Sequence, residues 1–219
     1  FTTMNRMMIK QLLQTGSINN DYMLSGWVRT KRGSKNMSFI MLNDGSCLED
    51  MQIIVDDKNL LKAINTISTG ASISVLGTLI ESEGKGQNLE LIAKEISLLG
   101  VADSEEYPIQ PKKHTLDFLR KNAHLRFRTK TYSSVFRIRH GLSFAIHKFF
   151  NDKNFYHIHT PIITSADAEG AGEMFKVTTF EMDNIPKNEN NIVDYTKDFF
   201  SKKANLTVSG QLEAELAAL

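Results

Sequence analysis

From Tyr22 to Leu99 the chain alternates between apolar and polar positions in short runs, which is the pattern of half-buried β-strands. Each run is rich in β-branched and apolar residues, and turn-forming residues such as Asn43-Asp44-Gly45-Ser46 separate one run from the next. We therefore expect five strands, near Tyr22–Arg29, Ser38–Asn43, Met51–Val55, Ala71–Ile80 and Leu89–Leu99.

One helical pattern interrupts these strands, between the third and the fourth. Leu60, Leu61, Ile64 and Ile67 recur at three- and four-residue steps, which predicts a helix over Lys58–Ile67. Five strands with a single helix among them are typical of an OB barrel. The predicted fold class is therefore α+β, with a five-stranded OB-fold β-barrel at residues 1–102.

Residues 103–130 are expected to form a hinge between two domains. Pro108 and Pro111 stand there among acidic and basic residues, and a short helix is predicted over Thr115–Asn122. The composition of this stretch differs from the regular patterns on either side of it.

Helical periodicity begins the second domain, which is expected at residues 131–219. Apolar residues recur at three- and four-residue steps along Thr131–Asp152, so this segment predicts a long amphipathic helix whose apolar face needs a partner. A turn at Lys153-Asn154 and a short strand over Phe155–Thr160 are expected to follow.

Composition limits the classes of function that need to be considered. The chain has 219 residues, and its 26 Lys and Arg are matched by 25 Asp and Glu, so any RNA site must be a local patch. The single cysteine, Cys47, excludes an intramolecular disulfide and a cysteine-rich zinc site. Neither a membrane-span pattern nor a signal-peptide pattern is present, so we expect a soluble, cytoplasmic protein with no membrane partner.

A first candidate site combines an aromatic ring with cationic and amide side chains. Phe39 on the second strand can face outward beside the basic run that ends at Arg32, which would give bases a ring to stack on and phosphates a cation. Gln52 on the third strand could hydrogen-bond a base edge. The alternative is that Phe39 packs in the core and that the basic residues form a solvated loop.

Two further candidate segments lie in the second domain. Glu169 begins a glycine-rich stretch in which the backbone can approach a small ligand while the carboxylate meets an ammonium group, although a surface loop is the alternative. Ser209, Gln211 and Glu215 gather hydrogen-bonding groups where a β-rich segment becomes a helix. Here the alternative is an ordinary helix start that Ser209 caps.

Metal and nucleophile chemistry find little support in the sequence. His157 and His159 alternate along one run without a third ligand nearby, so no metal site is expected. The chain has no Gly-x-Ser-x-Gly elbow, and Cys47 lies in a turn without an evident base, so nucleophilic hydrolysis is not indicated.

These segments, in this order, resemble the class II aminoacyl-tRNA synthetases, in their asparaginyl and aspartyl branch. The string Glu169-Gly-Ala-Gly-Glu-Met-Phe-Lys-Val-Thr-Thr, with Asp198-Phe-Phe and Leu206-Thr-Val-Ser-Gly-Gln-Leu downstream, looks like bacterial asparaginyl-tRNA synthetases. The stretch from Lys153-Asn-Phe155 to Pro161 is similar to the first class II motif, which implies a homodimer interface at Phe155 and Pro161. The resemblance implies that the second domain is the first part of an antiparallel-sheet catalytic domain.

The resemblance also implies roles for the candidate residues. Phe39 would be the base-stacking aromatic of an anticodon-binding domain, Arg32 a loop arginine beside it, and Gln52 the glutamine that recognises an anticodon uracil. The residues expected to bind the amino acid are Glu169, Ser209, Gln211, Ala214 and Glu215. The implied partners are asparagine, ATP and the asparagine tRNA.

By the same resemblance, the later class II motifs, with the main ligands of ATP and Mg²⁺, are expected beyond Leu219. No catalytic residue is therefore expected within this chain, which would be a fragment that is inactive alone. Three alternatives stay open, namely an aspartyl-tRNA synthetase, a non-catalytic tRNA-binding OB module and a general single-strand binder. Ala214 argues against the first, because a lysine stands there in the aspartyl branch to pair with the substrate carboxylate.

Overall fold

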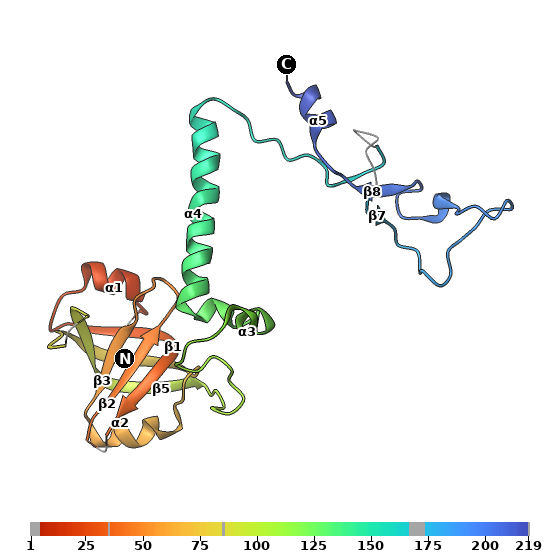
Figure 1. Ribbon diagram of the computed structural model, residues 1–219. Helices are drawn as coiled ribbons and strands as arrows, with labels where there is room; N and C mark the ends of the chain where they lie inside the picture. Colours follow the sequence, from red (N-terminus) through yellow and green to blue (C-terminus); the bar gives the residue numbers. More distant parts are fainter. Residues whose placement is uncertain (1–4, 35, 85, 167–173, 219) are drawn as a thin grey trace. The chain divides into compact units, whose positions relative to one another are not determined.

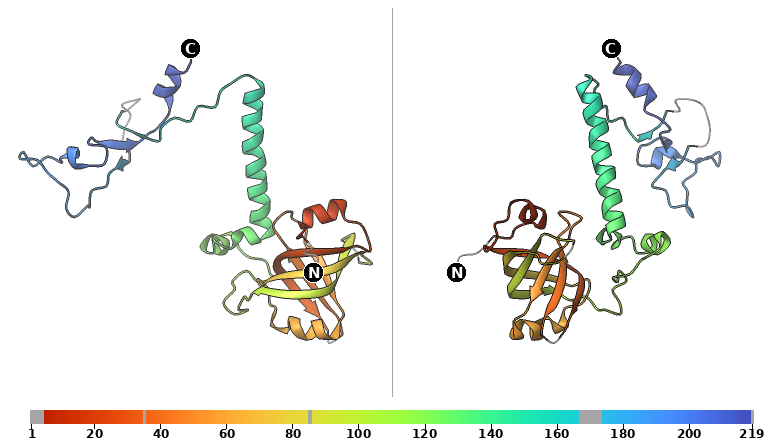
Figure 2. Two further views of the ribbon diagram at one scale, coloured as in Figure 1. Left: turned by 180° about the vertical axis from the view of Figure 1, so that it is seen from behind. Right: turned by 60° about the vertical axis from the view of Figure 1, so that its left-hand side comes forward.

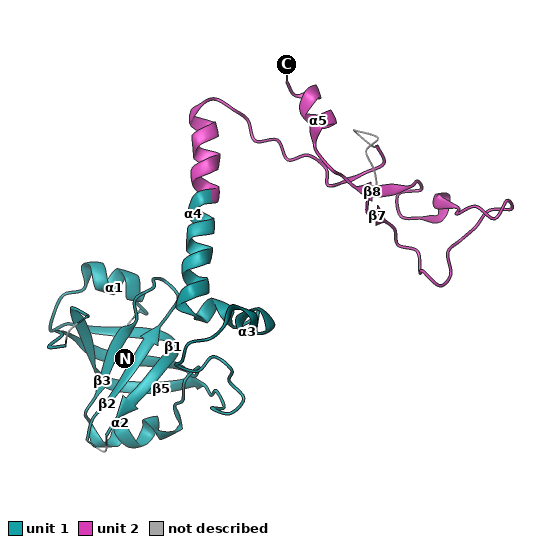
Figure 3. Ribbon diagram, viewed as in Figure 1, with its two compact units in different colours: residues 1–142 teal, residues 143–219 magenta. Residues whose placement is uncertain are grey.

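The computed structural model describes residues 5–34, 36–84, 86–166 and 174–218 (Figure 1). Helices and strands are both present, and the chain separates into two compact units, residues 1–142 and 143–219 (Figure 3). The predicted α+β class is confirmed. The domain boundaries expected at 102/103 and 130/131 stay predictions.

The first unit contains a closed five-stranded barrel in the order β1-β2-β3-β5-β4. All neighbouring strands are antiparallel except β3 and β5, which run parallel. The five strands predicted from the sequence are confirmed, and their bounds are β1 Asp21–Gly33, β2 Ser38–Asn43, β3 Met51–Val55, β4 Ser72–Glu81 and β5 Leu89–Gly100.

The barrel interior is filled by the apolar half of each alternating strand. On β2, Ile40 and Leu42 are fully buried while Phe39 and Met41 are only partly buried, so the period of two places alternate side chains inside and outside. Ile53 on β3 and Leu91 on β5 are also fully buried. Full burial of one such side chain contributes about 1.5–3 kcal/mol, which makes these positions the main source of barrel stability.

Two helices lie at opposite ends of the barrel (Figures 1 and 2). At one end, α2 spans Lys58–Ala63 and continues as the 3-10 turn η1 at Ile64–Thr66, so the predicted helix over Lys58–Ile67 is confirmed with a tighter last turn. At the other end lies α1, Ile9–Thr15, which the sequence pattern did not indicate.

Helix α1 is held by a contact from a distant turn. Its first residue, Ile9, is fully buried, and the Ile9 amide donates a hydrogen bond of 2.8 Å to Oδ2 of Asp44. The preceding residue, Met8, supplies no side-chain cap. A carboxylate that is 35 positions away along the chain therefore does what a local N-cap residue does in other helices.

The segment after the barrel contains α3 (Leu116–Lys121), the 3-10 turn η2 (Arg126–Arg128) and the long helix α4 (Lys130–Asp152). Thr115 caps α3 by accepting a hydrogen bond of 3.2 Å from the Phe118 amide. The guanidinium of Arg128 lies 4.8 Å from the centre of the Trp27 ring, which is cation–π distance. The predicted short helix and the predicted long helix are both confirmed.

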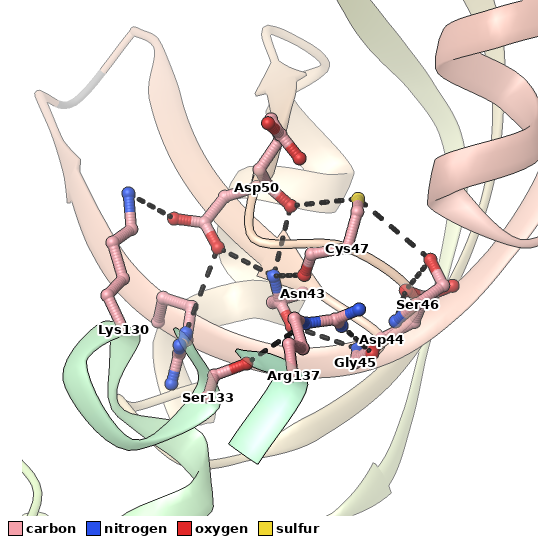
Figure 4. A network of polar contacts seen from close by, with 11 residues as sticks. Asn43, Asp44, Gly45, Ser46, Cys47, Asp50, Lys130, Ser133 and Arg137 are labelled. Atoms are coloured by element: carbon pink, nitrogen blue, oxygen red, sulfur yellow. Dashed lines mark hydrogen bonds and ion pairs between the residues drawn. The ribbon is translucent and has the colours of Figure 1, made fainter. Parts of the chain in front are cut away.

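A polar network attaches the start of α4 to the turn between β2 and β3 (Figure 4). Arg137 donates through Nη2 to the carbonyl oxygen of Gly45, and Lys130 Nζ lies 3.6 Å from Oδ2 of Asp50. Within the turn, Asn43 donates to Oδ1 of Asp50 at 2.9 Å. The turn predicted at Asn43–Ser46 therefore also serves as the attachment point of this helix.

The second unit contains a small antiparallel sheet in the order β6-β8-β7. The strand predicted over Phe155–Thr160 is wrong, because no residue of that run pairs with another strand and β6 is Ile163–Thr164. The other elements of this unit are β7 (Lys176–Val177), the 3-10 turn η3 (Tyr195–Lys197), β8 (Ala204–Leu206) and α5 (Gln211–Leu216).

A buried carboxylate organises the loops around this sheet. Asp198 accepts hydrogen bonds through Oδ1 from the Thr179 amide at 3.0 Å, the Thr179 hydroxyl at 2.9 Å and the Phe199 amide at 2.8 Å. Hydrogen bonding from the Thr178 side chain, together with these donors, lowers the pKa of Asp198 to about 2. The charged carboxylate therefore ties the loop after β7, at Thr179, to the segment that begins at Asp198.

Candidate nucleic-acid interface and amino-acid segment

The outer face of the barrel presents an aromatic ring beside a guanidinium group. Because Ile40 and Leu42 point inward, Phe39 points outward, where it is half-buried. Arg32 is its partner in the β1–β2 register, and the Arg32 guanidinium lies 5.8 Å from the centre of the Phe39 ring. Phe39 is thus no core residue, and one face of the barrel offers both a ring and a cation.

Gln52 lies on the same outer face, next to this pair. Its Oε1 accepts a hydrogen bond of 3.5 Å from Nη2 of Arg32, and its Nε2 donates one of 2.8 Å to Oε1 of Glu90. The structure therefore brings Arg32, Phe39 and Gln52 together from three strands. Since Gln52 is only 7% exposed and both ends of its amide are engaged, its orientation is fixed.

Glu90 is a member of this group that sequence analysis did not single out. It is 6% exposed, it pairs with Gln52 in the parallel β3–β5 register, and its Oε1 also accepts hydrogen bonds from Ser82 Oγ and Gln87 Nε2. Its other oxygen, Oε2, accepts no hydrogen bond from any residue that the structure describes. A carboxylate oxygen beside an aromatic platform can accept from the N–H groups of a base edge.

The candidate residues of the second unit lie where β8 leads into α5. Gln211 is the first residue of α5, and its Nε2 donates a hydrogen bond of 2.9 Å to Oε1 of Glu215, four residues further on. These two side chains therefore share one face of the helix. Ala214 lies between them on the same short helix.

Ser209 does not cap α5 in the usual way. The N-cap position is Gly210, which makes no side-chain hydrogen bond, and the Ser209 hydroxyl accepts only a long hydrogen bond of 3.4 Å from the Gln211 amide. A side chain at Gly210 would meet the Thr160 side chain, so the close approach of two segments requires glycine there. Glu169, the remaining candidate, lies outside the described residues.

The segment expected to form a dimer interface is exposed. Phe155 is 64% exposed and packs edge to face on Phe150, with 5.6 Å between the ring centres, and Pro161 is exposed as well. None of the residues of α4 is buried.

The described residues match neither the pattern of a metal site nor that of a membrane-spanning helix. The part of the chain that the structure describes contains no group of three His, Cys, Asp or Glu that could hold a metal ion, and His157 instead contacts the His147 ring. Among the same residues, no helix has the length and apolar character needed to cross a membrane.

Comparison with known families assigns two segments of the chain. Residues 22–99, which cover the barrel, match the OB-fold nucleic acid binding domain. Residues 115–212 match the class II tRNA synthetases of the D, K and N group. The chain belongs to the class II tRNA synthetases. In this family context, the ring, cation and carboxylate lie within the nucleic-acid-binding match, and β8 and the first two residues of α5 lie within the synthetase match.

Individual relatives of this class II synthetase chain agree with the family matches. An asparagine–tRNA ligase of Parabacteroides distasonis is 52% identical over 217 residues, which cover 99% of this chain and 46% of that protein. The chain thus spans about half the length of this curated relative.

Solved structures support the fold of this class II synthetase chain. The asparaginyl-tRNA synthetase of Pyrococcus horikoshii complexed with asparaginyl-adenylate has a TM-score of 0.74 at 17% identity, over 97% of this chain and 45% of that one. The aspartyl tRNA synthetase of Entamoeba histolytica has a TM-score of 0.60 at 19% identity, over 74% of this chain and 40% of that one. The fold is therefore shared by both branches.

Proposed function

We propose that this chain is part of an enzyme that uses ATP to join asparagine to the asparagine tRNA. The observation that carries the proposal is the 52% identity to an asparagine–tRNA ligase along 99% of the chain, since the fold alone is common to the asparaginyl and aspartyl branches. The proposed place of action is the cytoplasm.

The role proposed for the barrel is recognition of the tRNA anticodon. Phe39 would stack on one base, and the Arg32 guanidinium beside the ring would meet the adjoining backbone or base edge. Gln52 and Glu90 would recognise base edges, because one supplies an amide and the other a carboxylate in a fixed, buried hydrogen-bond chain.

The role proposed for the β8–α5 segment is selection of the amino acid. Asparagine and aspartate have nearly equal size, so the site must distinguish them by charge and by hydrogen-bond polarity. Glu215 would accept a hydrogen bond from the amide nitrogen of asparagine and repel the carboxylate of aspartate. Ala214 supports the same choice because it provides no cation, and Ser209, Gln211 and Glu169 are proposed to complete the amino-acid site.

ATP and Mg²⁺ are proposed cofactors of the whole protein. The described residues include no cluster of acidic side chains suited to a metal ion, so no step through Mg²⁺ is assigned to them. When bound, ATP would supply the α-phosphorus that the amino-acid carboxylate attacks, so that an adenylate forms and pyrophosphate leaves. The residues of this chain are proposed only to orient asparagine and the tRNA.

We also propose that the exposed apolar face of α4 is covered by a second copy of the protein. Exposed large apolar residues continue along the helix and beyond it, which is unusual for a free surface. They are Val135, Ile138, Leu142, Phe144, Ile146, Phe149, Phe150 and Phe155. The similarity of the stretch from Phe155 to Pro161 to the first class II motif supports a homodimer.

Replacing Phe155 with serine is expected to weaken this dimer in the whole protein that contains the chain. Removal of an aromatic anchor from the centre of an interface costs about 2 kcal/mol or more, which raises the dissociation constant at least about tenfold. Sedimentation velocity over a range of concentrations measures the change. Phe199→Ser, which removes an exposed ring elsewhere, is the control, and an equal effect of both variants would contradict an interface at Phe155.

The direct test of the proposed function is aminoacylation by the whole protein. We expect it to charge the asparagine tRNA with asparagine and to discriminate against aspartate. Efficient charging with aspartate instead would assign the protein to the aspartyl branch.

A further inference from the structure

A cationic cavity lies next to the stacking face of the barrel. It has a volume of about 800 Å³, and it is lined by the end of β1, the β1–β2 loop, α2 and η1. Its described lining contains no carboxylate. Its charged and polar members are Lys31, Arg32, Ser34, Asn36, Ser38, Lys58, Lys62 and Asn65. We call this feature the basic groove.

Helix α2 presents two of these cations on one face. Lys58 and Lys62 are four residues apart, so they are neighbours on the helix surface, where like charges repel each other. The nearest acid along the chain, Asp57, accepts hydrogen bonds from the Asn59 and Leu60 amides at 2.8 and 2.9 Å. Its carboxylate is thus engaged in capping α2.

Strand β1 supplies the other two cations. Lys31 Nζ donates a hydrogen bond of 2.8 Å to the carbonyl oxygen of Ile64, which ties β1 to the junction of α2 and η1. Burial lowers the pKa of Lys31, so its ammonium group is partly desolvated. Arg32 lies over Phe39 and therefore belongs to both the groove and the stacking face.

The four cations have no anionic partner among the described residues. Every ion pair found in the described part of the chain involves other lysines and arginines. With a net charge of only +1 on 219 residues, an uncompensated group of four cations is a local concentration of charge. Such a group, with polar side chains among it, is suited to a polyanion.

We propose that the basic groove binds the phosphate backbone of the single-stranded RNA loop next to the base that stacks on Phe39. The proposal rests on the proposed function, because it continues the path of the same RNA. Arg32 is shared by the two features, so a nucleotide stacked on the ring has its neighbouring phosphates at the entrance of the groove. Asn36 and Asn65 provide amide donors for phosphate or ribose oxygens.

The experiment measures how RNA affinity depends on salt. The probes are a synthetic RNA stem-loop with an asparagine anticodon and a single-stranded oligonucleotide with the sequence of its loop. Lys58→Gln, Lys62→Gln and the double variant are compared with the unmodified 219-residue chain. Glutamine has a helix propensity similar to that of lysine, so the substitutions remove charge with little effect on α2. Lys10→Gln, on α1 at the opposite end of the barrel, is the control.

We expect the slope of log affinity against log salt to fall in magnitude by about 0.7 to 1 for each lysine removed, with both RNAs. Lys10→Gln should leave the slope unchanged. An unchanged slope in the double variant, an equal loss in the control, or a loss confined to the stem-loop would each overturn the proposal. If any of these three outcomes is found while Phe39→Ala still weakens RNA binding, the groove proposal fails and the proposed function survives. If the unmodified chain binds neither RNA, both fail.

Discussion

Replacing Phe39 with alanine is expected to weaken binding of an RNA stem-loop with an asparagine anticodon by about 1–3 kcal/mol. That range is typical for loss of one base–aromatic stack. The barrel should stay folded, because Phe39 lies on the outer face and the fully buried residues of β2 are Ile40 and Leu42. Fluorescence anisotropy of a labelled stem-loop measures the binding change, and thermal unfolding measures the fold.

Two further substitutions at this position separate stacking from simple packing. Phe39→Tyr keeps an aromatic face and should retain most of the affinity. Phe39→Leu keeps an apolar side chain without a π face and should bind nearly as weakly as Phe39→Ala. If Phe39→Leu binds like the unmodified chain, or if Phe39→Ala unfolds the barrel, the stacking assignment is wrong.

Replacing Glu215 with glutamine in the whole protein is expected to reduce discrimination against aspartate by on the order of 1–3 kcal/mol. The carboxylate is proposed to accept a hydrogen bond from the substrate amide and to repel a substrate carboxylate, and glutamine removes the negative charge. Gln211 supports the role, since its hydrogen bond to Oε1 holds the Glu215 side chain in one orientation. The measurement is the ratio of adenylation efficiencies for asparagine and aspartate.

Glu213 supplies a matched control for this experiment. It is a glutamate on the same helix, but it lies two residues from Glu215 and therefore on a different face. Glu213→Gln should leave the ratio of efficiencies unchanged. If Glu215→Gln also leaves it unchanged while adenylation stays normal, Glu215 does not select the amino acid.

The barrel was predictable because its signal is local. Alternation of period two along β2 follows directly from which face of a strand is buried, so the strands could be predicted, although the sequence left open whether Phe39 faces outward or packs in the core. The long helix over Lys130–Asp152 was predictable for the same reason, since its apolar period extends over several turns.

Features that depend on distant partners were missed or wrong. Helix α1 is capped by Asp44, and Glu90 contacts Gln52 through the parallel pairing of β3 with β5. The residues next to α1 and next to Glu90 in the sequence do not indicate either contact. The strand predicted over Phe155–Thr160 was wrong. A strand needs a neighbour for its backbone groups, and that pairing begins only at Ile163.

The group proposed to bind the anticodon was predictable in part. The ring, the cation and the amide at Phe39, Arg32 and Gln52 could be named from the residue pattern and the family resemblance, and the structure places them together. The basic groove needed the structure, because its cations come from β1 and α2, whose segments are separated by two strands along the chain.

Aminoacylation by the whole protein that contains this chain tests whether that protein joins asparagine to the asparagine tRNA. Transcripts of the asparagine tRNA, with their own anticodon or with an aspartate anticodon, are incubated with ATP, Mg²⁺ and either amino acid. We expect efficient charging of the native transcript with asparagine, weak charging after the anticodon exchange, and little charging with aspartate. Charging with aspartate, or charging with asparagine that does not depend on the anticodon, would contradict this expectation.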